Sequence, residues 1–99
     1  MKIEWLPKAE RNRETQLAYV AEHSPSAAIA MGDAIQRAVA RLSEHPMSAR
    51  LGRVQGTREL AVAGTPYVIV FRVERNAVAI LRVLHGKQRW PVERDGIVG

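Results

Sequence analysis

The sequence has no cysteine among its 99 residues, and its three histidines stand far apart. Without thiols the chain can form no disulfide, has no cysteine nucleophile and offers no cysteine ligand to a metal. The spacing of His23, His45 and His85 matches no metal-site pattern, and no glycine motif for phosphate or dinucleotide binding is present. We therefore predict neither a metal nor a cofactor.

Long hydrophobic runs are also missing. No apolar stretch approaches the roughly 20 residues that span a bilayer, and residues 1–7 lack the apolar core of a signal peptide. Apolar residues make up 46% of the chain and charged residues 25%, which is typical of a soluble globular protein. We expect one cytoplasmic domain with no membrane partner.

Acidic residues are scarce in the second half of the chain. Residues 1–49 hold six basic and six acidic side chains, whereas residues 50–99 hold nine basic and four acidic ones, so the net charge of +5 lies in the second half. A field of this sign favours an acidic partner, either a nucleic acid or an acidic protein segment. A basic surface that only keeps the protein soluble is the alternative.

The first half predicts a short strand followed by two helices. Residues 2–6 alternate polar and apolar side chains, as a half-buried strand does. A helix begins near Lys8, and its sparse apolar residues predict packing only through its second half. Ser24 and Pro25 are typical cap and first-turn residues of a second helix, which ends near residues 44–46 and forms an antiparallel hairpin with the first. The apolar stripe of this second helix consists of Ala27, Met31, Ala34, Ile35, Ala38, Val39 and Leu42.

The second half predicts a loop and then three consecutive strands joined by short turns, which must form an antiparallel meander. The order β-α-α-β-β-β predicts an α+β fold, in which the helix hairpin packs on one face of an antiparallel sheet and leaves the other face partly free. We assign residues 1–91 to this single domain and residues 92–99 to a C-terminal tail. The loop spans residues 47–56, and the strands span residues 58–63, 67–73 and 78–84.

Three arginines of the predicted sheet are candidates for a shared basic surface. Alternation along the strands sorts side chains onto two faces, and along the last strand it places Arg82 on the same face as Ile80. We expect Arg58, Arg72 and Arg82 to project together from the face that the helices leave free. Three unrelated surface arginines are the alternative, because long basic side chains often simply cover apolar surface.

The end of the last strand delivers polar side chains to one edge of the sheet. His85, Lys87, Arg89 and Trp90 follow a mostly buried apolar run, which suits a basic site held on a rigid element. His85 fits a general base, but a hydrogen-bonded structural histidine is favoured because no carboxylate lies nearby in sequence. Trp90 fits stacking on a base or a partner, or packing over the edge of the core. Composition and spacing therefore give no catalytic constellation.

Three segments of the sequence together resemble one known family. The first is Ala-Tyr-Val-Ala-Glu-His-Ser-Pro-Ser-Ala-Ala at residues 18–28 with Leu-Ser-Glu-His-Pro at residues 42–46. The second is Gly-Thr-Arg-Glu-Leu at residues 56–60 with Tyr-Val-Ile-Val-Phe-Arg-Val at residues 67–73, and the third is Ile-Leu-Arg-Val-Leu-His-Gly-Lys-Gln-Arg-Trp-Pro at residues 80–91. In this order they are similar to the RelE/ParE superfamily of bacterial type II toxins, whose fold has the same order of elements.

The resemblance implies a toxin and two kinds of partner. One is a cognate antitoxin encoded alongside, whose flexible and often acidic segment wraps the toxin, in keeping with the one-sided basic charge. The other is operator DNA, which the pair binds through the antitoxin. The resemblance implies no cofactor.

Two activities divide the superfamily. RelE-like members cut mRNA on the ribosome, whereas ParE-like members poison DNA gyrase without cutting RNA. This sequence departs from the RelE pattern: Val68 stands where an arginine tends to follow the aromatic residue, Gln88 stands where a basic residue is placed, and no tyrosine follows Tyr67. We therefore favour a non-enzymatic gyrase inhibitor. A ribosome-dependent mRNA endoribonuclease and a non-toxic fold member that only binds its antitoxin are the alternatives.

The same resemblance implies site residues. If the chain were a ribonuclease, the catalytic candidates would be Arg58, Arg82, His85 and Lys87. The candidates for contact with the antitoxin or the target are Arg58, Arg72, Arg82, His85, Lys87, Arg89 and Trp90.

Overall fold

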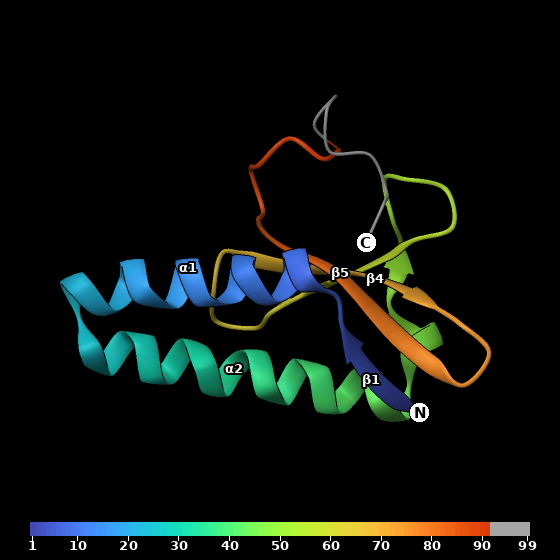
Figure 1. Cartoon of the computed structure of the whole chain (residues 1–99), viewed down its shortest axis with the longest axis horizontal. Helices are drawn as coiled ribbons and strands as arrows, with labels where there is room; N and C mark the ends of the chain where they lie inside the picture. The colour runs from blue at the N-terminus through green and yellow to red at the C-terminus, as the bar shows by residue number, and fades with distance from the viewer. Residues whose placement is uncertain (92–99) are drawn as a thin grey trace.

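A computed structural model of the chain describes residues 1–91, and the predicted tail at residues 92–99 lies outside this part. Two helices and a sheet form two layers (Figure 1). None of the helices in the described part is long and apolar enough to cross a bilayer. The elements are, in chain order, β1 (Lys2–Trp5), α1 (Pro7–His23), α2 (Pro25–Glu44), a short 3-10 helix (Pro46–Ser48), β2 (Arg50–Leu51), β3 (Arg58–Ala61), β4 (Tyr67–Val73) and β5 (Ala77–His85).

The sheet is mixed, with the strand order β1-β5-β4-β3-β2. The predicted antiparallel meander of β3, β4 and β5 is confirmed. The prediction of a wholly antiparallel sheet is wrong, because β1 lies parallel to β5 and reaches it through the helix hairpin and the meander. The predicted loop also contains β2, which pairs Arg50 with Glu59 and Leu51 with Arg58. A strand of two residues is too short to show an alternating pattern in the sequence.

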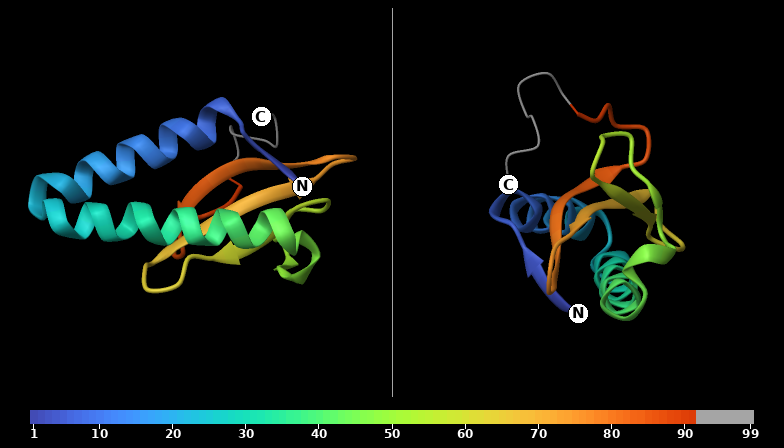
Figure 2. Two further views of the ribbon diagram at one scale, coloured as in Figure 1. Left: turned by 90° about the horizontal axis from the view of Figure 1, so that it is seen from below. Right: turned by 90° about the vertical axis from the view of Figure 1, so that its right-hand side faces the viewer.

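The α2 helix follows its predicted pattern. Its N-terminus is capped by Ser24, whose Oγ accepts a hydrogen bond from the backbone N–H of Ala27 at 3.2 Å. The two helices lie side by side against one face of the sheet (Figure 2). Burying the α2 stripe against the sheet makes the main core, which includes Met31, Ala34, Ile35, Leu42, Ile69, Phe71, Val78 and Ile80.

The α1 helix contacts the sheet through its first half as well, contrary to the prediction. Ala9 is fully buried. Asn12 Oδ1 accepts a hydrogen bond from the Val83 N–H at 3.3 Å, and Gln16 Nε2 donates to the Val83 carbonyl at 2.8 Å. The reason is that β1 pairs only with the first part of β5. Beyond Ile80 the backbone groups on this edge of β5 have no neighbouring strand, and polar side chains of α1 form hydrogen bonds with them instead.

A β-bulge in β5 changes which side chains share a face. Val70 of β4 pairs with Arg82, but the next residue, Phe71, pairs with Ile80, so Leu81 is the extra residue. The side chains of Ile80 and Arg82 therefore point to opposite faces, and the predicted strict alternation along this strand is wrong. We call the face opposite α1 and α2 the helix-free face, and Arg82 lies on it beside Val70.

Candidate functional site

Arg58 does not project from the helix-free face, so the predicted convergence of three arginines is wrong. Arg58 pairs with Phe71 across β3 and β4, and Phe71 belongs to the core beneath the helices. Its guanidinium donates to the carbonyl of Ala49 at 2.8 Å and to that of Met47 at 3.4 Å. These hydrogen bonds hold the segment after α2 against the sheet.

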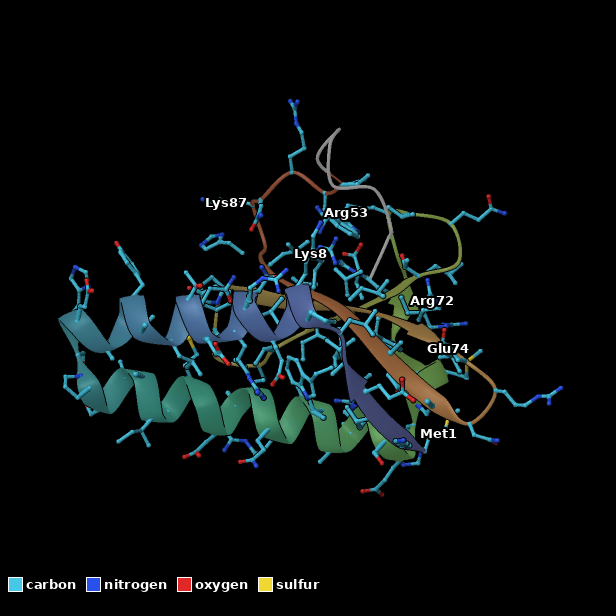
Figure 3. The ribbon with its side chains drawn as sticks, in the orientation of Figure 1. Met1, Lys8, Arg53, Arg72, Glu74 and Lys87 are labelled. Carbon is cyan, nitrogen blue, oxygen red and sulfur yellow. The ribbon has the colours of Figure 1, made fainter. Side chains whose placement is uncertain are left out.

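Arg72 and Arg82 lie on the helix-free face but in different surroundings. Arg72 is partly exposed and pairs with Glu74 at 3.2 Å, and the two lie together at the end of β4 (Figure 3). Arg82 is only 2% exposed. Its Nη1 donates to the Leu81 carbonyl at 2.6 Å, and its guanidinium carbon lies 5.3 Å from the centre of the Trp90 ring. A cation that is buried over an aromatic ring is part of the packing of this face.

Trp90 packs over the edge of the core, which was one of its two predicted roles. It is buried in a second apolar cluster on the helix-free face, with Val70, Leu81 and Leu84. Among residues 1–91 its Nε1 has no hydrogen-bond partner. The segment that follows β5 therefore folds back onto the sheet and covers part of the face that was expected to be free.

His85 sits in a hydrogen-bonded turn just after the buried part of β5. Its Nδ1 faces the backbone N–H of Lys87 at 3.2 Å, and its carbonyl accepts the N–H of Gln88 at 2.8 Å. Because an N–H can only donate, Nδ1 must accept, so the proton of the neutral ring lies on Nε2. In this geometry His85 has no free ring nitrogen to act as a base. Lys87 and Arg89, in the same segment, are exposed.

Sequence reasoning missed a buried carboxylate, Glu59, on the helix-free face of β3. The side chain is 1% exposed and is bound by two arginines of the preceding segment. Its Oε1 accepts from Arg50 Nη2 at 3.1 Å, and its Oε2 accepts from the backbone N–H of Arg53 at 2.8 Å and from Arg53 Nε at 3.1 Å. Arg53 Nη1 also donates to the Gln88 carbonyl at 3.2 Å, which joins this network to the C-terminal segment.

The electrostatics of Glu59 favour its charged form. Burial alone would raise the pKa of the carboxyl, but the hydrogen bonds from the Arg53 backbone, the Arg53 guanidinium and Arg50 outweigh burial and hold the pKa below its usual value. In the sequence, Glu59 could have been noticed as an acidic residue in the strongly basic half, on the opposite strand face from Arg58 and Leu60. That signal could not show which arginines would meet it.

The arginine network borders a hollow of about 350 Å³ lined by Arg50, Leu51, Gly52, Arg53, Glu59 and Gly86. Within residues 1–91 no group of histidine and acidic side chains is arranged to hold a metal ion. The helix-free face thus combines a buried arginine over a tryptophan, a buried carboxylate and two partly exposed arginines. These charged groups bond to one another and to backbone carbonyls of neighbouring segments.

Comparison with known proteins identifies the family. Residues 3–90 match the sequence model of a family described as the ParE toxin of the type II toxin–antitoxin system parDE. The chain belongs to the ParE toxin family. A relative from Sinorhizobium fredii (strain NBRC 101917 / NGR234), described as "Putative toxin Y4kP", is 41% identical over 90 residues, which cover 91% of this chain and 93% of the relative.

A solved structure agrees with the ParE assignment at the level of the fold. A chain from the chromosomal ParDE toxin–antitoxin system of P. aeruginosa superposes with a TM-score of 0.78 and 24% sequence identity, covering 86% of this chain and 95% of that chain. The α+β class and the resemblance to the ParE branch are therefore confirmed. Membership of the ParE family implies an antitoxin partner.

Proposed function

We propose that this ParE-family chain arrests bacterial growth by acting on DNA gyrase in the cytoplasm and is neutralised by a cognate antitoxin. The observation that carries the proposal is the match of the ParE family model to residues 3–90, nearly the whole described chain. Neutralisation by an acidic antitoxin segment agrees with the basic second half of the sequence. Binding of operator DNA would then occur through the antitoxin.

The arrangement of the four ribonuclease candidates supports a non-enzymatic toxin. Cleavage of a phosphodiester needs an acid or base and a charge-stabilising group around one phosphate. Arg58 lies in the row of Phe71 on the helix side, whereas His85 lies in the row of Tyr67 at the end of the sheet. Tyr67 and Phe71 are four positions apart along β4, which separates the two rows by roughly 13 Å.

The two remaining candidates do not complete a nuclease site either. Arg82 is buried and bonded to a backbone carbonyl. Lys87 is close to His85, but its backbone N–H occupies the Nδ1 atom that would act as the base. The four side chains therefore do not surround a common phosphate.

The test is expression in a bacterium without antitoxin, with two readouts in the same cells. A reporter of DNA damage measures the effect on gyrase, and mapping of mRNA ends measures cleavage on ribosomes. We expect growth arrest with an induced reporter and intact mRNA, in the wild type and in His85→Ala. Arrest with cleaved mRNA and a silent reporter would contradict the proposal, and so would normal growth at full expression of folded protein.

A further inference from the structure

The hollow beside Glu59 lies at the β2 edge of the sheet. Its lining comes from β2, from the loop after β2, from Glu59 of β3, and from Gly86 in the turn after β5. The two arginines of this lining are held by the same carboxylate, because Arg50 Nη2 bonds to Oε1 and Arg53 Nε bonds to Oε2 of Glu59. Figure 3 shows Arg53 on the side of the sheet away from α2. The hollow therefore opens on the helix-free face with its guanidinium groups already oriented.

Both arginines keep donors for a ligand. A guanidinium carries five N–H groups. Arg50 uses only Nη2, and Arg53 uses Nε and Nη1, so Nε and Nη1 of Arg50 and Nη2 of Arg53 have no partner within residues 1–91. Paired guanidinium donors in a fixed orientation match the geometry of an oxyanion. The ligand class is therefore an anion with two or more oxygen atoms.

The rest of the lining favours a protein carboxylate over a nucleic acid. Two arginines and one glutamate leave one unit of positive charge, which suits a single anionic group. None of the lining residues is aromatic, so none can stack on a base, and the nearby Trp90 is buried.

We propose that this hollow binds an aspartate or glutamate side chain of the antitoxin, with Arg50 and Arg53 as its direct partners. The inference rests on the proposed function, since the antitoxin supplies the acidic segment. It adds a site that does not overlap the seven candidates taken from the sequence. Electrostatic complementarity at such a site raises the association rate and fixes the register of the bound segment.

The experiment measures the affinity of the antitoxin encoded beside this chain for purified variants, by calorimetry at low and high salt. Arg50→Gln removes the charge but keeps a donor for Glu59, and Arg50→Lys keeps the charge but loses the planar fork. Arg53→Gln removes the charge of the second direct partner and keeps a donor for Glu59. Arg75→Gln is the matched control, because it removes one charge from the exposed turn between β4 and β5.

We expect Arg50→Gln and Arg53→Gln to weaken antitoxin binding by about tenfold or more at low salt, with a smaller effect at high salt. Arg50→Lys should lie between Arg50→Gln and the wild type, and Arg75→Gln should bind within about twofold of the wild type. Thermal unfolding of each variant confirms that it is folded, and Arg50→Lys and Arg53→Gln still test the site if Arg50→Gln does not fold.

The outcomes separate this inference from the proposed function. If the wild type does not bind the antitoxin at all, the proposed function fails and the inference fails with it. If the wild type binds but folded Arg50→Gln and Arg53→Gln behave like Arg75→Gln, only the inference is overturned. A titration with a 12-nucleotide single-stranded RNA is the last arm: loss of RNA binding in Arg50→Gln with unchanged antitoxin affinity would assign the hollow to phosphate and overturn the inference.

Discussion

Replacement of Glu59 by glutamine tests the buried network on the helix-free face. Glutamine keeps the size of the side chain, but it removes the charge and turns one acceptor into a donor that faces the arginines. The wild-type carboxylate accepts three hydrogen bonds, from Arg50 Nη2, Arg53 Nε and the Arg53 N–H. Glu59→Gln therefore leaves at least one of these donors without an acceptor in a buried position.

The size of the expected loss in stability depends on how well water can solvate Arg50 and Arg53 after Glu59 is replaced. Removing one member of a buried ion pair costs about 3–5 kcal/mol when the other member stays buried. Here the side chains of Arg50 and Arg53 are 67% and 39% exposed, so water can solvate them once the carboxylate is gone. We expect Glu59→Gln to lower the free energy of unfolding by about 2–3 kcal/mol. For a domain of this size the melting temperature should fall by about 10–20 °C.

The assay is urea unfolding followed by tryptophan fluorescence and circular dichroism at pH 7. Glu74→Gln is the control, because Glu74 forms a partly exposed pair with Arg72 at 3.2 Å and its loss should cost less than about 1 kcal/mol. A folded Glu59→Gln protein whose free energy of unfolding matches that of the control would refute the reasoning, since the network would then contribute nothing beyond a surface pair.

The same network predicts a pH dependence. A carboxyl whose folded-state pKa is below its unfolded-state value stabilises the fold above the unfolded-state pKa of about 4.3 and loses that contribution as the pH falls through the folded-state pKa. The difference in unfolding free energy between the wild type and Glu59→Gln should thus be complete at pH 7 and should shrink below about pH 4. A difference that grows on acidification would contradict the lowered pKa.

Three further substitutions test other parts of the account by urea unfolding at pH 7. Trp90→Ala should cost about 3–5 kcal/mol, because the ring is buried against Val70 and Leu84, and a loss under about 1 kcal/mol would mean that the C-terminal segment does not pack on the sheet. Ser24→Ala should cost about 1 kcal/mol through loss of the α2 cap, whereas Ser24→Gly should cost less. Gln16→Ala should cost about 1–2 kcal/mol because the Val83 carbonyl loses its donor, and no change would show that water replaces the side chain.

The parts of the fold that the sequence predicted are those with a long periodic signal. The α2 helix carries seven apolar residues at helical spacing between a serine cap and a proline, and all of them except the exposed Ala27 are buried or half-buried. The β4 strand is likewise a continuous apolar run that becomes a central strand. Such segments are determined by their own residues, so a single sequence suffices to place them.

The incorrect predictions concern residues whose position depends on contacts with a neighbouring segment. The polar first half of α1 looks like a solvent-exposed face, but Asn12 and Gln16 complete the open edge of β5. The bulge at Leu81 sends Arg82 to the face opposite Ile80, and no residue in that run signals a bulge. Register across strands is a tertiary property, which is why the positions of Arg58, Arg72 and Arg82 could not be derived from alternation alone.

Some features of the candidate site could likewise be predicted from the sequence, and others could not. The sequence indicated a basic second half and a strand that ends in His85 at one edge of the sheet, and packing over the core was one of two predicted roles of Trp90. It did not indicate Glu59, because a lone acid in a strand shows its partners only after β2 and the following loop have folded over it. Buried ion networks depend on contacts between segments, and pattern analysis of one segment does not contain them.

The most direct test of the central claim is a DNA supercoiling assay with purified gyrase and the purified chain, run beside an assay of mRNA cleavage on programmed ribosomes. The account predicts inhibited supercoiling that the antitoxin reverses, together with intact mRNA. Normal supercoiling with cleaved mRNA would contradict it and would assign Arg58, Arg82, His85 and Lys87 to a catalytic site that forms only on the ribosome.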